Sequence, residues 1–223
     1  MKKRAYSISV LTAVMLLFLT IGNSSADYIT AGDTIVFQDL FAPRPAGYLG
    51  GPFSATINND FSFNTFCVEF GESLNFGSPF FVGGINTSTV ATNKPLTGEA
   101  KYLYYNYRVG KLDDLAGLFD YGNGDDQRTL QMAIWYSMGW DSNSTFNAQK
   151  LLPFFDSDLY NQLLAISAGM GAGIDNVVVL NIVDANQTNR QDVLAMVPEP
   201  ATLLLLGLGL IGLAGFGRRR FKS

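Results

Sequence analysis

The spacing of hydrophobic and polar residues changes twice along the chain. Five segments carry β-branched and aromatic residues in partial alternation with polar ones, and Gly, Pro and Asn separate them. This pattern predicts strands. The segments are residues 28–40, 53–58, 61–70, 176–183 and 191–197.

Between the third and fourth of these segments the apolar residues recur at helical spacing, which predicts helices. The segments are residues 97–109, 125–138 and part of 147–168. Asp125 or Asp126 is available as the N-cap of the second helix, and Gly139 follows it as a stop. The order of strands, helices and strands predicts an α+β domain, namely a β-sandwich or barrel with a helical insertion.

The first 26 residues have the three parts of a secretory signal peptide. Three basic residues at positions 2–4 precede a mostly apolar run over 8–21. Small residues then lead to a cleavage site between Ala26 and Asp27. An uncleaved membrane anchor is the alternative, and in both cases residues 27–197 are expected to form an exported globular domain.

Residues 198–223 show the same physical features in reverse order. Three residues that interrupt regular structure come first, then an uncharged run rich in Leu and Gly over 201–217, then a basic tail. At about 1.5 Å per residue, the apolar run is just long enough for a transmembrane helix. The residues at the two ends of this segment are Pro198, Glu199, Pro200, Arg218, Arg219 and Arg220.

These features together resemble the PEP-CTERM sorting signal of Gram-negative bacteria. The resemblance implies that an exosortase recognises the tripeptide and removes the tail after a transient stay in the inner membrane. The protein would then reach the cell surface or the extracellular matrix, where such proteins accompany exopolysaccharide. A plain C-terminal membrane anchor is the alternative.

The composition of residues 27–197 excludes several classes of function. The chain of 223 residues has no histidine and one cysteine, so it cannot form a Ser-His-Asp triad, an internal disulfide or an iron–sulfur cluster. With 8 basic and 18 acidic residues, this region lacks the positive charge that nucleic-acid binding needs. We therefore expect no nucleic-acid partner, and we expect no cofactor or metal site. The single-use capture described below, which has no turnover, would not be enzymatic. The acidic loop 120–126 lacks the residue order of an EF-hand.

The cysteine stands in a strand-like stretch, Phe66-Cys67-Val68-Glu69. An exported protein with one cysteine requires an explanation for it, and three are open: deep burial, an intermolecular disulfide, or use of the sulfur in another covalent bond. A later helical stretch reads Gln131-Met132-Ala133-Ile134-Trp135.

The two stretches together resemble the thioester domain of bacterial surface adhesins, although Leu130 stands where that family has threonine. The resemblance implies that the Cys67 sulfur attacks the side-chain carbonyl of Gln131 and expels ammonia. Phe66, Trp135 and Tyr136 would then keep water from the thioester. Glu69 would orient or deprotonate an incoming amine, or serve as an ordinary strand carboxylate.

Two functions follow from these resemblances. The first is a covalent adhesin that captures an amine of a partner, such as a surface protein, once and without turnover. The alternative is a non-covalent structural or carbohydrate-associated protein of an exopolysaccharide matrix, whose cysteine is simply buried.

Overall fold

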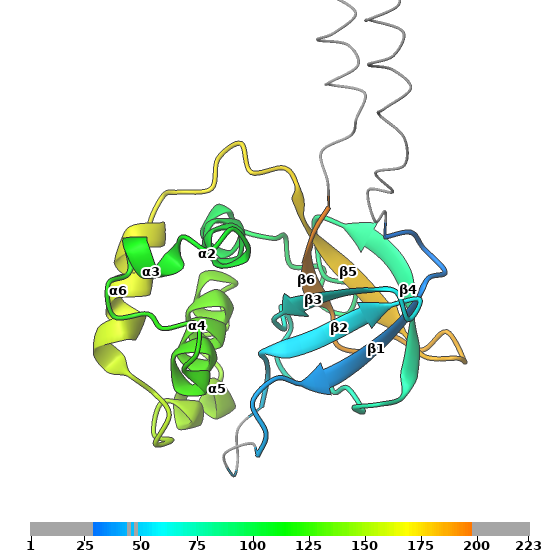
Figure 1. Ribbon diagram of the computed structural model, residues 1–223, viewed down its shortest axis with the longest axis horizontal. Coiled ribbons are helices and arrows are strands. Elements are labelled where there is room, and N and C mark those ends of the chain that lie inside the picture. Colours follow the sequence, from blue (N-terminus) through cyan, green and yellow to red (C-terminus); the bar gives the residue numbers. More distant parts are fainter. Residues whose placement is uncertain (1–28, 44–45, 47–48, 198–223) are drawn as a thin grey trace, which may run out of the picture.

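The structure, a computed structural model, describes residues 29–43, 46 and 49–197 (Figure 1). The predicted signal peptide, its cleavage site, the sorting tripeptide, the apolar run 201–217 and the basic tail lie outside these residues. Among the described residues, no helix combines the length and the apolar character that crossing a membrane requires.

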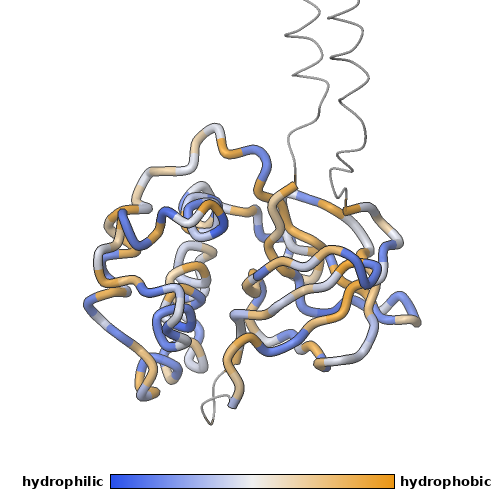
Figure 2. Tube along the Cα trace, in the orientation of Figure 1, coloured by the Kyte–Doolittle hydropathy of each residue, from blue (hydrophilic) through white to orange (hydrophobic). Residues whose placement is uncertain are grey.

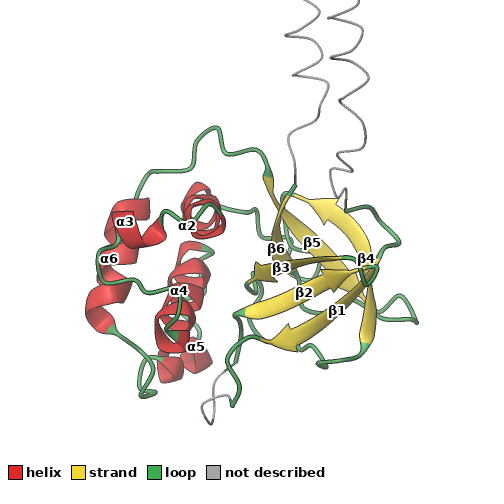
Figure 3. Ribbon diagram, viewed as in Figure 1, coloured by secondary structure: helices red, strands yellow, loops and turns green. Residues whose placement is uncertain are grey.

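The described chain divides into a sheet half and a helical half, which lie side by side (Figures 1 and 3). The sheet half holds six antiparallel strands in the order β3-β2-β1-β4-β5-β6. These strands are β1 Thr34–Asp39, β2 Phe53–Ile57, β3 Phe61–Thr65, β4 Pro79–Asn86, β5 Val177–Val183 and β6 Val193–Met196.

Alternation places one face of the early strands in the core. Ile35 and Phe37 of β1 are fully buried, whereas Gln38, the next residue along the strand, is exposed. All seven residues of β5 are buried because helix α2 Gly98–Arg108 lies against this strand. In Figure 2 hydrophobic residues run along β5, whereas hydrophobic and hydrophilic residues are mixed along β1 and β2.

The two edges of the sheet meet just beyond β3, so the sheet is nearly closed into a barrel. The amide of Leu194 donates to the carbonyl of Phe66 at 3.1 Å, and the amide of Val68 donates to the carbonyl of Asp192 at 3.1 Å. Between these two bonds, Cys67 forms an isolated antiparallel bridge with Val193. Cys67 therefore lies on the seam where the barrel closes.

The helical half is inserted between β4 and β5, and thus between the third and fourth of the strand segments that the sequence predicts. Besides α2, the described helices are α3 Leu112–Leu115, α4 Gly124–Ser137, α5 Ser144–Gln149 and α6 Ser157–Ser167. Helices α2, α4 and α6 pack against one another. The α+β class and the barrel with a helical insertion are thus confirmed.

Several predicted boundaries differ from the structure. The first strand begins at Thr34 because Thr30 to Asp33 form a turn, in which Gly32 has a φ of +97°. The third strand ends at Thr65, since the chain bends after Cys67. Strand β4 was not predicted, because Gly83 and Gly84 interrupt its alternation at a β-bulge.

Candidate functional site

The carboxamide of Gln131, on α4, lies against the backbone of Cys67. Its Oε1 accepts a hydrogen bond from the Cys67 amide at 2.8 Å, and its Nε2 donates to the Cys67 carbonyl at 2.8 Å. A second amide, that of Gly51, also donates to Oε1 at 3.0 Å. Cys67 is 2% exposed and Gln131 is 0% exposed. The structure thus brings together the two residues that the sequence singled out.

Helix α4 aims this carboxamide at the barrel seam. Its N-cap is Asn123, whose side chain accepts from the amide of Asp125 at 2.9 Å, so the predicted capping by Asp125 or Asp126 is wrong. The helix ends at Ser137, and Gly139 follows with a φ of +75°, as predicted.

Three successive carbonyls of the seam accept hydrogen bonds from side chains on or just after α4. Gln131 Nε2 binds the first, that of Cys67. Trp140 Nε1 binds the carbonyl of Val68 at 2.9 Å, and Trp135 Nε1 binds that of Glu69 at 3.0 Å. These contacts satisfy backbone groups that the ladder with β6 leaves open, and they fix the position of Cys67 relative to Gln131.

Two glycines bring a third piece of backbone onto the carboxamide. A Cβ on Gly51 would come within 3.0 Å of Gln131 Oε1. A Cβ on Gly50, whose φ is +115°, would collide with the ring of Trp135. Only glycine allows the backbone to approach this closely.

Cys67 lines a pocket of about 170 Å³ beside the seam. Apolar side chains form most of its wall, and Glu72 is the one charged side chain among its described lining residues. The described lining consists of Leu49, Gly50, Phe53, Cys67, Glu72, Ser73, Leu74, Phe76 and Gln191.

Glu69 does not line this pocket. Its carboxylate is 1% exposed, and Oε1 accepts from the amide and hydroxyl of Thr92 at 3.1 and 3.0 Å. Oε2 is buried with no hydrogen-bond partner. The predicted role of Glu69 toward an incoming amine therefore has no access route in this arrangement.

Asp192 is the second buried carboxylate near the seam. It accepts from the amides of Val90 and Ile182 and from the side chain of Asn181, at 2.7 to 3.2 Å. Burial, and after it the negative charge of Glu69, raises the pKa of Asp192 to about 6. The two carboxylates together hold the loop that contains Val90 and Thr92.

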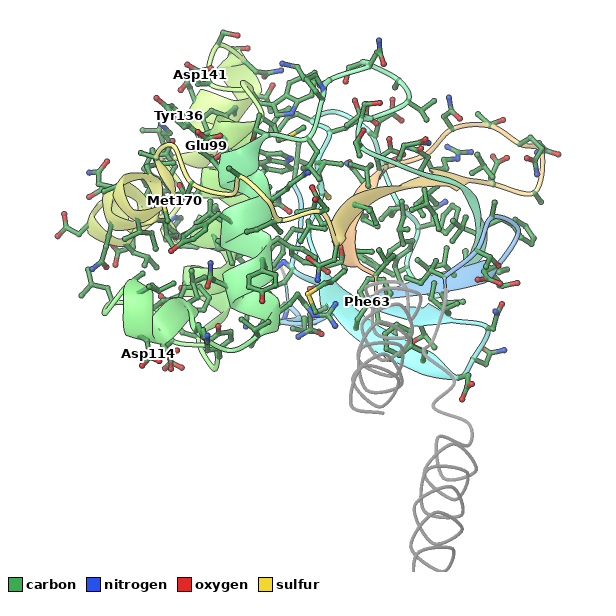
Figure 4. All side chains as sticks on the ribbon, turned by 90° about the horizontal axis from the view of Figure 1, so that it is seen from above. Phe63, Glu99, Asp114, Tyr136, Asp141 and Met170 are labelled. Carbon is green, nitrogen blue, oxygen red and sulfur yellow. The ribbon has the colours of Figure 1, made fainter. Side chains whose placement is uncertain are left out.

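The aromatic residues expected around the site divide into two groups. Trp135 is 1% exposed and packs edge-on against Phe70, with ring centroids 4.6 Å apart. Phe66 is fully buried but points to α2, where its ring meets that of Tyr107 at 5.0 Å. Tyr136 was expected beside the thioester, and this is wrong. It is 42% exposed on the helical half (Figure 4), because one residue along a helix turns the side chain by about 100°.

The acidic loop 120–126 is organised by its own hydrogen bonds. Asp126 accepts from the amide of Asp120 at 2.8 Å and from the side chain of Asn123 at 2.8 Å. Within the described residues, no group of three or more Cys, Asp or Glu side chains is arranged to hold a metal ion.

Sequence reasoning missed Gly51, Glu72, Gln191 and Trp140. Gln191 Nε2 donates to the carbonyls of Glu69 and Asp192 at 3.0 and 3.1 Å, and it lines the pocket beside Cys67. The adjacent glycines at 50 and 51 were a usable signal, since such pairs mark close backbone approaches. Nothing in the sequence distinguished Glu72 or Gln191 from other surface residues.

Residues 197–220 match the PEP-CTERM protein-sorting motif. No curated protein matches the chain, and no solved structure matches it. The motif indicates an exported protein that is anchored transiently at its C-terminus and processed by an exosortase. The sorting part of the sequence prediction is thereby confirmed. The motif does not cover the exported domain, so an argument about the activity of that domain must start from the Cys67–Gln131 site.

Proposed function

We propose that the exported domain forms an internal thioester between Cys67 and Gln131 and uses it to capture a partner amine covalently. The observation that carries this proposal is the pair of amides, from Cys67 and Gly51, that donate to Gln131 Oε1. The protein acts once and is consumed, so it is an adhesin and not an enzyme.

The chemistry of closure needs the thiol to attack an amide carbonyl, which is a poor electrophile. Attack of Sγ on Cδ places a negative charge on Oε1, where the two amides already point. Preorganised donors of this kind stabilise the tetrahedral intermediate. Ammonia then leaves with the thiol proton, and a C–S bond replaces the C–N bond.

Burial supports both the formation and the survival of the bond. Three hydrogen bonds to the backbone of Gly51 and Cys67 hold the carboxamide in place, so the carboxamide is already positioned beside the cysteine before the reaction. Gly50 lies between Gln131 and the ring of Trp135, and Gln131 is 0% and Cys67 2% exposed, so bulk water is kept from the site. Among the described residues, the pocket that Cys67 lines is the access that we propose for a nucleophile. A nucleophile that enters the pocket would displace the sulfur and become joined to Gln131 through an amide bond.

Intact mass spectrometry of the exported domain tests the proposal. The wild-type domain should weigh one ammonia less than its sequence, and Cys67→Ala and Gln131→Ala should each carry the full sequence mass. Treatment with methylamine should add methylamine to the wild-type domain and to neither the Cys67→Ala nor the Gln131→Ala variant. Gln38→Ala, on the exposed side of β1, is the control and should keep the deficit.

A wild-type domain of full sequence mass would contradict the proposal. Gln131 would then be a structural amide that joins the helical half to the barrel seam, and Cys67 a buried core residue. The exported protein would in that case belong with the non-covalent matrix proteins.

A further inference from the structure

The pocket at Cys67 combines apolar walls with one acid. Phe53 and Phe76 form part of the wall, with ring centroids 5.5 Å apart, and Phe76 is 40% exposed at the surface. Glu72 is exposed, and no hydrogen bond or ion pair joins its carboxylate to another described residue. An apolar pocket with this one carboxylate among its described lining residues suits a ligand with an alkyl stem and a positive charge.

We propose that Glu72 is the specificity-determining residue of the capture reaction, and that it selects a primary alkylammonium group for the pocket that leads to Cys67. This inference rests on the proposed thioester. It assigns the recognition of the amine to Glu72, in place of Glu69, to which the sequence analysis gave a role toward the amine.

The other acids near the seam cannot take this role. Glu69 is held beneath the loop at Thr92, and Asp192 accepts from Val90, Asn181 and Ile182. Both are 1% exposed. Gln191, the neighbouring polar side chain in the pocket, is neutral and is held by two backbone carbonyls. Glu72 is thus the one charged group among the described lining residues that an entering cation meets.

The reaction balances without a further reagent. The bound ammonium gives one proton to Glu72 or to water, and the neutral amine nitrogen attacks the thioester carbonyl carbon. A C–N bond forms as the C–S bond breaks, and the sulfur leaves as the Cys67 thiolate. The nitrogen then loses a second proton, which the thiolate takes up, so the products are an amide, a thiol and one proton.

The experiment compares wild type with Glu72→Gln in the full exported domain, after both have been shown to lack one ammonia. At low ionic strength the rate of butylamine addition should fall roughly five-fold in Glu72→Gln, because one favourable charge interaction is lost. High salt should shrink this difference by screening the exposed carboxylate. Asp114→Asn is the matched control, since Asp114 lies on α3 in the helical half (Figure 4) and its loss should leave the rate unchanged.

A second measurement separates ammonium binding from general effects on the thioester. Butyltrimethylammonium has no nitrogen lone pair and cannot be acylated, but it carries the same butyl stem and the same charge as protonated butylamine. It should protect the wild-type thioester from cleavage by hydroxylamine, which is uncharged at neutral pH, and it should fail to protect Glu72→Gln. Equal protection and equal butylamine rates in the two proteins would overturn the role of Glu72. Absence of the ammonia deficit in wild type would instead overturn the thioester itself, and the assignment of Glu72 with it.

An alkylammonium group reaches the pocket either as a free amine or as a lysine side chain of a polypeptide. Nα-acetyl-lysine methylamide distinguishes these sources. Addition of this compound with the same dependence on Glu72 as butylamine supports a lysine side chain. Addition of butylamine alone supports a small free amine, and addition of neither contradicts the proposal.

Discussion

The side chain of Gln131 pairs with the backbone of Cys67 as a neighbouring strand would, although the two residues stand 64 positions apart. One amide group thereby occupies both the donor and the acceptor of Cys67 at the point where the barrel closes. The same contact joins the helical half to the sheet half. Gln131 therefore has a structural role, joining the two halves, in addition to the proposed chemical role as acyl donor. Experiments must separate the two roles.

The structural role of Gln131 can be measured in a Cys67→Ala background, where no thioester forms. There, Gln131→Met should lower the free energy of unfolding by roughly 2–5 kcal/mol, because it keeps most of the side-chain volume but removes the three buried hydrogen bonds of the carboxamide. Urea denaturation measures the loss. Gln38→Ala in the same background should change stability by less than about 0.5 kcal/mol. A similar value for both variants would show that the contacts of Gln131 add nothing to stability.

Gly50 tests the close approach of the 50–51 backbone to α4. Gly50→Ala should cost about 1–3 kcal/mol more than Gly32→Ala in thermal or urea unfolding. Both glycines have a positive φ, of +115° and +97°. The added Cβ meets the buried Trp135 ring at position 50, whereas at position 32 it meets nothing within 4 Å. Equal losses would mean that backbone conformation alone accounts for the effect.

The sequence predicted an element of this fold when the hydrophobic periodicity was regular over the whole length of that element. Helix α4 was found because its apolar stripe extends through several turns, and Gln131 and Trp135 fall on one face of it. Strand β4 was missed because a bulge at Gly83 and Gly84 breaks its alternation. Local pattern therefore succeeded where one regular periodicity covered a whole element.

The candidate site was only partly predictable for a different reason. Cys67 and Gln131 are distinctive residue types in recognisable motifs, so they could be singled out without a structure. The amide of Gly51, the pocket at Glu72 and the indole of Trp140 act through tertiary contacts between distant segments. No periodicity or motif in one sequence encodes such contacts. Tyr136 was expected to shield the site, but it is exposed, whereas its neighbour Trp135 on the same helix is buried.

The sorting motif gives a prediction that is independent of the thioester. Glu199→Ala within the matched residues 197–220 should stop exosortase processing, because the resemblance to the sorting signal implies that the enzyme recognises the tripeptide. The variant should then stay in the membrane fraction with its C-terminal segment attached, as a C-terminal epitope tag would reveal. Thr202→Ala, just beyond the tripeptide, is the control and should be processed normally. Loss of the tag from both variants would contradict recognition through Glu199.

Asp192 connects the stability of the seam to pH. Its pKa in the folded protein is raised to about 6, chiefly by burial, whereas an unfolded aspartate titrates near 4. The folded state therefore binds a proton more tightly than the unfolded state does. The stabilisation from this proton is complete below about pH 4 and is lost as the pH rises through about 6.

The prediction is that the stability difference between wild type and Asp192→Asn changes in favour of the variant as pH rises from 4 to 7. Neutral Asn cannot lose a proton, so its contribution stays constant over this range. Urea midpoints at several pH values measure the difference. Asp184→Asn is the control of opposite sign, because its pair with Arg190 at 2.7 Å lowers the pKa of Asp184 below the ordinary value. Wild type should therefore gain on this variant as pH rises through the acidic range. A flat difference for Asp192→Asn would mean that burial does not raise the pKa of Asp192, and would contradict the prediction.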